Sequence, residues 1–144
     1  MGKVSIVYWS GTGNTEAMAA AMAEGAKDAG AEVELLTVDK AEAAAISEAK
    51  AFALGCPAMG AEELEEGEME PFMAELDSQI AGKTIALFGS YGWGSGEWMR
   101  EWESRVTSDG AAVLSGEGII ADNAPDDEVL AECRAAGAKL AALV

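Results

Sequence analysis

The chain has 144 residues, half of them hydrophobic, which suits one folded domain with a core of its own. Its 26 acidic and nine basic side chains give a net charge of −17 at pH 7, which disfavours binding to nucleic acid or to an anionic membrane. Histidine is absent, and the two cysteines lack a metal-binding spacing, so a metal centre is not expected. With no signal peptide or membrane span in the pattern, we expect a reducing, cytoplasmic location.

Strand and helix patterns alternate along the chain. Apolar runs predict strands at 3–9, 32–38, 50–55, 83–89 and 111–120, the second at a sheet edge and the last interrupted by Gly116 and Gly118. Helices are predicted at 14–29, 41–48, 67–80, from Gly96 or Glu97 onward, and after Pro125. Such alternation indicates an α/β fold, with a parallel sheet covered on both faces, over the single domain 1–144. Ligands of these sheets bind beyond the carboxyl ends of the strands, here in loops 9–16, 56–62 and 89–97.

The first of these loops is rich in hydroxyl groups and glycine. It lacks the third glycine of a dinucleotide fingerprint, where Glu16 stands, and the lysine of a Walker A loop. Its backbone amides at a helix N-terminus can hold a phosphate that stays bound and is never transferred. The alternative is an ordinary capped turn, although caps explain only one or two such residues. The candidate phosphate ligands are Ser10, Gly11, Thr12, Gly13, Asn14 and Thr15.

The other two loops carry side chains suited to a flat ring. Tyr91 and Trp93 stand among glycines, which leaves an aromatic side chain free to contact a planar ligand. Met59 can contact the opposite face of such a ring, because thioethers pack well on aromatics, although by itself it is better explained as core. Trp98 and Trp102, spaced four residues apart on a helix, are expected to pack on the sheet.

Three stretches resemble the flavodoxin family, in its short-chain form from anaerobic bacteria: YWSGTGNTEAMA, GCPAMGAEELE and LFGSYGWGSGEWM. The resemblance covers nearly the whole chain, and no long insertion interrupts the fifth strand. It implies a three-layer flavodoxin-like fold, with a five-stranded parallel sheet in the order 2-1-3-4-5 and helices on both faces. It also implies one tightly bound FMN and one-electron transfer between redox proteins, often in place of ferredoxin.

By motif position, the resemblance assigns the FMN phosphate to the first loop and the flavin ring to the other two. Met59 and Trp93 match the residues that flank the isoalloxazine ring. Gly60 matches a glycine whose peptide reorients on reduction, and Glu62 an acid that accepts from flavin N3–H. Pro57 stands where some relatives have a serine that assists the phosphate, so the phosphate loop carries more of the binding here. The other matched flavin contacts are Ala58, Ser90, Tyr91, Gly92, Gly94 and Asn123.

The same residues bear on the redox chemistry. A carbonyl that swings toward flavin N5 stabilises the neutral semiquinone, and Gly60 tolerates the positive φ that this swing requires. Residues 62–70 hold six glutamates, and no cation lies in the three loops, so an anionic hydroquinone is disfavoured. We therefore expect a low-potential semiquinone/hydroquinone couple. The acids are also expected to dock basic faces of ferredoxin-type reductases and oxidoreductases.

Two other functions fit the same architecture. An FMN-dependent quinone or nitro reductase needs a substrate pocket over the flavin, for which the short loops and missing histidine offer little. A response-regulator-like domain needs paired acids after the first strand and a phosphorylatable Asp after the third, where Trp9-Ser10 and Cys56-Pro57 stand. We therefore expect a monomeric electron carrier rather than an enzyme.

Overall fold

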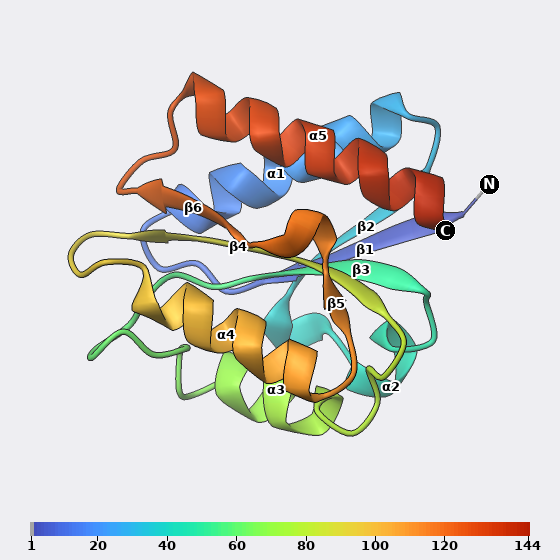
Figure 1. Ribbon diagram of the computed structural model, residues 1–144. Coiled ribbons are helices and arrows are strands. Elements are labelled where there is room, and N and C mark those ends of the chain that lie inside the picture. The colour runs from blue at the N-terminus through green and yellow to red at the C-terminus, as the bar shows by residue number, and fades with distance from the viewer. Residues whose placement is uncertain (1) are drawn as a thin grey trace.

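The computed structural model describes residues 2–144 (Figure 1). Its elements, in chain order and with the 3₁₀ turns marked η, are β1 (Lys3–Tyr8), α1 (Asn14–Asp28), β2 (Glu32–Thr37), η1 (Val38–Lys40), α2 (Ala43–Ile46), β3 (Ala51–Gly55), α3 (Met69–Leu76), β4 (Thr84–Tyr91), α4 (Glu97–Ser108), β5 (Ala112–Val113), η2 (Leu114–Gly116), β6 (Ile119–Asp122) and α5 (Asp127–Leu143). The predicted alternation of strands and helices is confirmed.

All strands run parallel, in the order β2-β1-β3-β4-β5, with β6 also paired to β4. Strand β3 is buried along its whole length, because both faces of a parallel sheet are covered by crossover helices. Strand β2 lies at the edge and stays partly exposed, as its mixed polar and apolar sequence predicts. The predicted strand order is therefore confirmed.

Helices form a layer on each side of the sheet. Helices α1 and α5 lie together on one face, and α2, α3 and α4 cover the other (Figure 1). Each layer closes its own hydrophobic core, one around Ile6 and Met18 and the other around Phe52 and Trp102. Helices α1 and α5 approach closely because residue 137 is glycine, where a Cβ atom would overlap the backbone of α1.

The strand predicted at 111–120 needs a correction, since it is two short strands, β5 and β6. Between them Ser115 and Gly116 adopt φ values of 63° and 87°, which turn the backbone out of the sheet. Pairing with β4 resumes at Ile119, opposite Phe88. Gly116 and Gly118, which interrupt the apolar pattern, thus mark a real break between β5 and β6. After this break β6 runs to Asp122, directly before Asn123.

The predicted acidic helix, 67–80, is also shorter than expected, since α3 begins at Met69 and ends at Leu76. The Glu65 carboxylate accepts hydrogen bonds from the N–H groups of Gly67, Glu68 and Met69 at 2.7–3.0 Å. These contacts fold the preceding residues into a turn that caps α3, because first-turn N–H groups have no partner within a helix. Over residues 2–144, no helix is both long and apolar enough to cross a bilayer.

Candidate functional site

Loops from three strands meet at the carboxyl end of the sheet and enclose a cavity of about 240 Å³. Its lining draws on the loops after β1, β3 and β4, together with the residue that follows β6. The predicted residues that line it are Gly11, Thr12, Asn14, Pro57, Ala58, Met59, Ser90, Tyr91, Gly92 and Asn123. No lysine or arginine is among the described residues lining this cavity, so it suits an anion held by neutral donors.

The first loop is organised around the hydroxyl of Ser10. Its Oγ accepts hydrogen bonds from the N–H groups of Gly13 and Glu16, both at 3.2 Å. Gly13 is the N-cap of α1 with φ 95°, a conformation that favours glycine. A Cβ atom at Gly13 would meet nothing within 4 Å, so the space in front of the helix N-terminus is open. The open helix end is a suitable cradle for a phosphate.

Thr15 lies in this loop but faces inward. Its side chain is buried, and its Oγ1 lies 3.4 Å from the Ser90 hydroxyl and accepts from the Ser90 N–H at the same distance. Thr15 therefore ties the start of α1 to the end of β4. Its predicted contact with a phosphate stays a prediction, whereas the tie between the first and third loops is observed.

The second loop makes a tight turn at Met59. Met59 and Glu63 exchange two backbone hydrogen bonds, at 2.9 and 2.8 Å. Between them Gly60 has φ 51° and Glu62 has φ 57°, both in the left-handed region. The positive φ predicted for Gly60 is therefore present, and a Cβ atom there would meet nothing within 4 Å. The Glu63 N–H holds the Met59 carbonyl, so the peptide of this turn that is left beside open space is the one after Gly60.

Glu62 joins the second loop to the third. Its carboxylate accepts from the N–H groups of Ser95 at 3.1 Å and Trp98 at 3.3 Å, at the N-terminus of α4. The Ser95 N–H contributes most to lowering the pKa of Glu62, because a hydrogen bond to the charged carboxylate favours it. Gly94, with φ 90°, permits this approach, since a Cβ atom there would overlap the Glu62 carboxylate. The predicted contact of Glu62 with flavin N3–H stays a prediction.

The third loop presents its aromatic side chains differently. Trp93 is 64% exposed, the largest exposure among the hydrophobic side chains described as exposed. Tyr91 lines the cavity and packs against Trp98, with ring centroids 5.5 Å apart and planes tilted by 49°. Asn123, at φ 62°, donates its backbone N–H to the Tyr91 carbonyl at 2.7 Å. An exposed tryptophan beside a cavity is a ready surface for a flat ligand.

Known proteins are similar to this chain over nearly its whole length. The flavodoxin family model matches residues 6–137. A flavodoxin from Megasphaera elsdenii is 48% identical over 135 residues, which span 92% of this chain and 98% of the relative. A flavodoxin from Clostridium beijerinckii is 45% identical over 138 residues, which span 96% of this chain and 99% of the relative.

The comparison extends to solved structures. The solution structure of two-electron reduced Megasphaera elsdenii flavodoxin matches with a TM-score of 0.86 at 47% identity, over 94% of this chain and 98% of that chain. This chain belongs to the flavodoxin family. Its cofactor is therefore FMN, and flavodoxins are electron-transfer flavoproteins that serve redox partner proteins.

The residues present fit FMN. A phosphate needs a cradle of neutral donors, which the open N-terminus of α1 at Gly13 provides. A flavin ring needs flat or polarisable surfaces, which Met59 and Tyr91 provide in the cavity and Trp93 beside it. Among residues 2–144, no group of three or more His, Cys, Asp or Glu side chains could hold a metal ion.

Sequence reasoning missed two residues of this flavodoxin site. Trp9 lines the cavity, donates its N–H to the Gly55 carbonyl at 3.0 Å, and lies against Gly11. Its position directly between a buried strand and the phosphate loop was the available signal. Trp98 was expected only to pack on the sheet, although it contacts both Glu62 and Tyr91.

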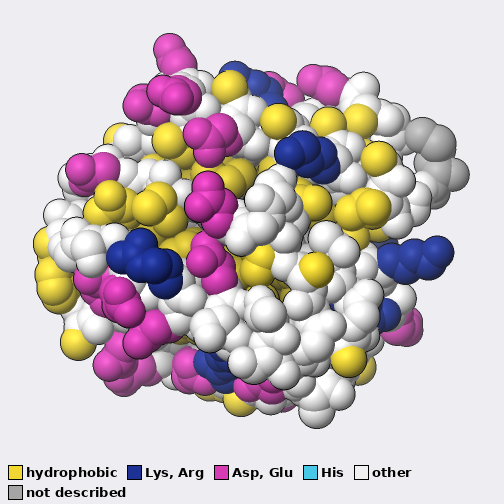
Figure 2. Space-filling model, viewed as in Figure 1, with side chains coloured by type: hydrophobic (Ala, Val, Ile, Leu, Met, Phe, Trp, Pro, Cys, Tyr) yellow, Lys and Arg dark blue, Asp and Glu magenta, His cyan; other side chains and the backbone are white. Residues whose placement is uncertain are grey.

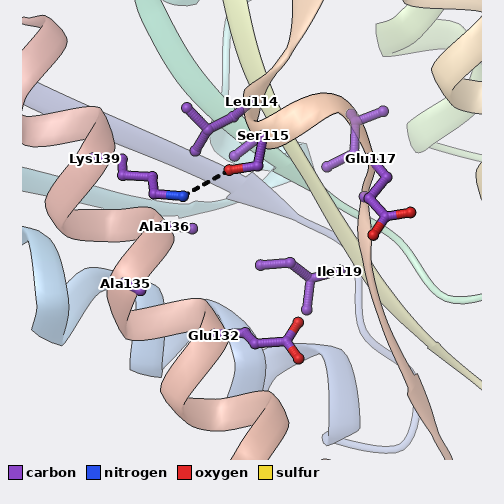
Figure 3. Close-up of a pocket in the computed structure, with 11 residues that line it drawn as sticks. Leu114, Ser115, Glu117, Ile119, Glu132, Ala135, Ala136 and Lys139 are labelled. Carbon is purple, nitrogen blue, oxygen red and sulfur yellow. Dashed lines mark hydrogen bonds between the residues drawn. The ribbon is translucent and has the colours of Figure 1, made fainter.

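A second cavity, of about 230 Å³, lies between α5 and the break between β5 and β6 (Figure 3). Lys139 reaches from α5 and donates to the Ser115 hydroxyl at 2.9 Å, while Glu117 and Glu132 line other walls. None of the predicted site residues lines this cavity. It lies at the edge of the sheet, whereas the predicted site residues gather at the carboxyl ends of β1, β3 and β4.

Proposed function

We propose that this flavodoxin is a low-potential one-electron carrier, which moves electrons between redox enzymes in place of ferredoxin. Tightly bound FMN supplies the redox chemistry by cycling between its one-electron and two-electron reduced levels. The observation that carries the proposal is the cavity at the carboxyl end of the sheet, which has no lysine or arginine among its described lining residues and an acidic segment beside it. A site of this kind binds a phosphate and disfavours added negative charge.

The proposed FMN contacts follow the geometry of the three loops. The phosphate lies at the N-terminus of α1, with Ser10 holding the loop in shape through the Gly13 and Glu16 N–H groups. Met59 and Trp93 flank the ring. Glu62 accepts from N3–H while it keeps the second and third loops together. The remaining contacts are Gly11, Thr12, Asn14, Thr15, Pro57, Ala58, Gly60, Ser90, Tyr91, Gly92, Gly94 and Asn123.

The turn at Met59 sets the balance between the reduced levels of the flavin. Gly60 holds φ 51° with open space around it, so its peptide can reorient at low energetic cost. A carbonyl brought to N5 accepts a hydrogen bond only when N5 is protonated. The glutamates of residues 62–70 oppose a further negative charge, and together these effects separate the two one-electron steps.

The acidic surface also defines the kind of partner. Carboxylates outnumber Lys and Arg side chains on the face shown in Figure 2, and a groove next to the second loop is lined by five glutamates, Glu62, Glu63, Glu66, Glu70 and Glu101. Such a surface favours redox enzymes with basic docking faces and disfavours nucleic acid and membranes. We propose a monomer that acts as one FMN-binding unit, residues 1–144, in the cytoplasm.

A stepwise dithionite titration of the purified protein tests this function. A yellow protein whose long-wavelength band rises to a maximum near one electron per FMN, and then disappears, supports one-electron carriage. Reduction in a single two-electron step would contradict it and favour the reductase. Steady NADH oxidation by the isolated protein would likewise favour an enzyme. A colourless protein that takes up no added FMN would remove the proposed cofactor site.

A further inference from the structure

Trp98 makes contact with both loops of the proposed ring site. It lies in the first turn of α4 and is 1% exposed. Its indole Nε1–H donates to the Cys56 carbonyl at 3.0 Å, and its backbone N–H donates to Glu62 Oε2 at 3.3 Å. Its ring also packs on Tyr91 at 5.5 Å. The Trp98 side chain therefore connects the start of the second loop with the wall of the cavity, and its backbone N–H adds a contact with the turn at Glu62.

The Cys56 carbonyl is the point at which the second loop leaves the sheet. The Cys56 N–H still donates to the Phe88 carbonyl at 3.0 Å, which is the continuation of the β3–β4 pairing. Residues Pro57 to Met59, which follow directly, line the flavin cavity. The orientation of the peptide at Cys56 thus sets the direction in which the ring loop departs.

The approach of the indole to this carbonyl depends on a glycine. A Cβ atom at Gly89 would overlap the Cys56 carbonyl oxygen and lie 3.2 Å from the Trp98 ring. Residue 89 sits in β4, next to Ser90, which lines the cavity. The hydrogen bond is buried, and a buried carbonyl that loses its donor is strongly disfavoured. The contact is therefore a specific constraint on the loop rather than general packing.

We propose that Trp98 is a positioning residue for the flavin ring: its indole N–H, through the Cys56 carbonyl, holds the loop of Met59 and Gly60 in the shape that binds FMN. The inference rests on the proposed FMN site and goes beyond the role in electron transfer. Loss of the indole N–H leaves the Cys56 carbonyl without this donor and loosens the base of the loop, which the Ala58 N–H still ties to the Ser90 carbonyl at 3.0 Å. The ring is then held less tightly, and the peptide after Gly60 is less well placed.

Trp102 provides a matched control on the same helix. It lies one turn further along α4, is also 1% exposed, and donates its indole N–H at 3.3 Å to the Met73 sulfur on α3. Met73 lies in the core and does not line the flavin cavity. Trp98→Phe and Trp102→Phe therefore remove the same group at equal burial, and only the first removes it from the ring loop.

The experiment titrates the apoprotein of each variant with FMN and measures the quenching of flavin fluorescence. We expect Trp98→Phe to weaken FMN binding about tenfold, which is about 1.4 kcal/mol, and Trp102→Phe to change it less than twofold. The gap between the two one-electron midpoint potentials should narrow only in Trp98→Phe. Equal effects of the two variants, or unchanged binding in Trp98→Phe, would overturn the proposal. If the wild-type protein binds one FMN, the proposed function stands whether or not Trp98→Phe weakens binding, so failure of the positioning role and failure of the function are distinguishable.

A measurement on the wild-type chain covers the case in which Trp98→Phe does not fold. The indole ¹⁵N–¹H resonances are followed in the apoprotein as FMN is added. Trp98 Nε1–H should resist exchange with solvent and shift on binding, whereas Trp102 Nε1–H should resist exchange and stay in place. A Trp98 indole that exchanges rapidly, or that does not move when FMN binds, would contradict a positioning role.

Discussion

Two residues of the second loop, Gly60 and Glu62, have unusual backbone conformations but differ in how firmly they are held. Gly60 and Glu62 both adopt left-handed backbone, which a glycine accepts readily and a glutamate seldom does. Glu62 is held there because its carboxylate accepts two N–H groups from the start of α4. Gly60 has no side chain to be held in this way, and the space where a Cβ atom would stand is empty to 4 Å. The turn is thus fixed at Glu62 and adjustable at Gly60.

Gly60→Ala tests the adjustable position. A Cβ atom would meet no neighbour there, but a φ of 51° is strained for alanine, so the change disfavours this turn and restricts the reorientation of the Gly60–Ala61 peptide. We expect the one-electron reduced form of bound FMN to lose about 1 kcal/mol of stability, which lowers the first potential and raises the second by about 40 mV each, so the gap between them narrows by about 80 mV. Redox titration with indicator dyes measures both potentials.

Gly82→Ala is the control for this change. Gly82 also has a positive φ, 83°, and open space around its missing Cβ, but it lies before β4 at the opposite end of the sheet. It should alter stability without altering either potential. A gap that is unchanged in Gly60→Ala, or that narrows equally in Gly82→Ala, would show that the peptide of Gly60 has no special role.

Among the elements, α3 and α4 are joined by a group of charges around Arg105. Arg105 on α4 contacts Glu70 at 2.8 Å and Asp77 at 2.8 Å, both in or at the end of α3. Asp109, directly after α4, has one carboxylate oxygen that is buried without a hydrogen-bond partner among the described residues. Burial, and then the neighbouring Asp77 carboxylate, raise the pKa of Asp109 to about 6.

The raised pKa of Asp109 predicts the direction of its effect on stability. An acid whose pKa is higher in the folded than in the unfolded state stabilises the fold while it is protonated. This contribution is complete below the ordinary pKa of 3.8 and is lost as the pH rises through about 6. Asp109→Asn, which stays neutral, should raise the free energy of unfolding at pH 8 by about 1 kcal/mol, a value reduced for solvent screening of a half-buried group.

Urea unfolding of the two proteins at pH 4 and pH 8 measures this effect. The difference between variant and wild type should appear at pH 8 and vanish at pH 4. Glu75→Gln, an exposed acid on α3, removes the same charge and should show little difference at either pH. A gain in stability that is the same for both variants would assign the effect to net charge instead of to Asp109.

The elements also show how far the sequence predicts the molecule. The parallel sheet and the three site loops follow from apolar runs that alternate with helix patterns, since that alternation specifies a parallel sheet and its carboxyl ends, whereas the strand order followed only from the resemblance to flavodoxins. The short α3 could not be foreseen, because it depends on the Glu65 carboxylate folding back on three N–H groups. Trp98 was missed for a similar reason: its partner Cys56 is 42 residues away, and no local pattern shows that contact.

At the scale of the whole molecule, the net charge of −17 acts on the flavin even from a distance. A carboxylate about 10 Å away contributes roughly 0.4–0.8 kcal/mol of repulsion at an effective dielectric constant of about 40–80. For one electron this is on the order of 20–35 mV for each carboxylate. We therefore expect the six glutamates between residues 62 and 70 together to lower the potential of the step that adds net charge to FMN.

Salt separates this long-range effect from contacts within the site. The screening length falls from about 30 Å at 0.01 M to about 3 Å at 1 M, so the lower midpoint potential should rise by several tens of millivolts over that range. The higher potential should move less, since its step takes up a proton with the electron.

Glu63 and Glu66, exposed beside the second loop, should account for part of the rise in the lower potential. Changing both to Gln should therefore raise the lower potential at low salt and flatten its salt dependence. Changing Glu48 and Glu75, exposed at the other end of the sheet, removes the same two charges and should shift the potential less. A lower potential independent of salt, or equal shifts from both pairs, would mean that contacts inside the cavity set the potential, because the charged surface would then have no measurable share in it.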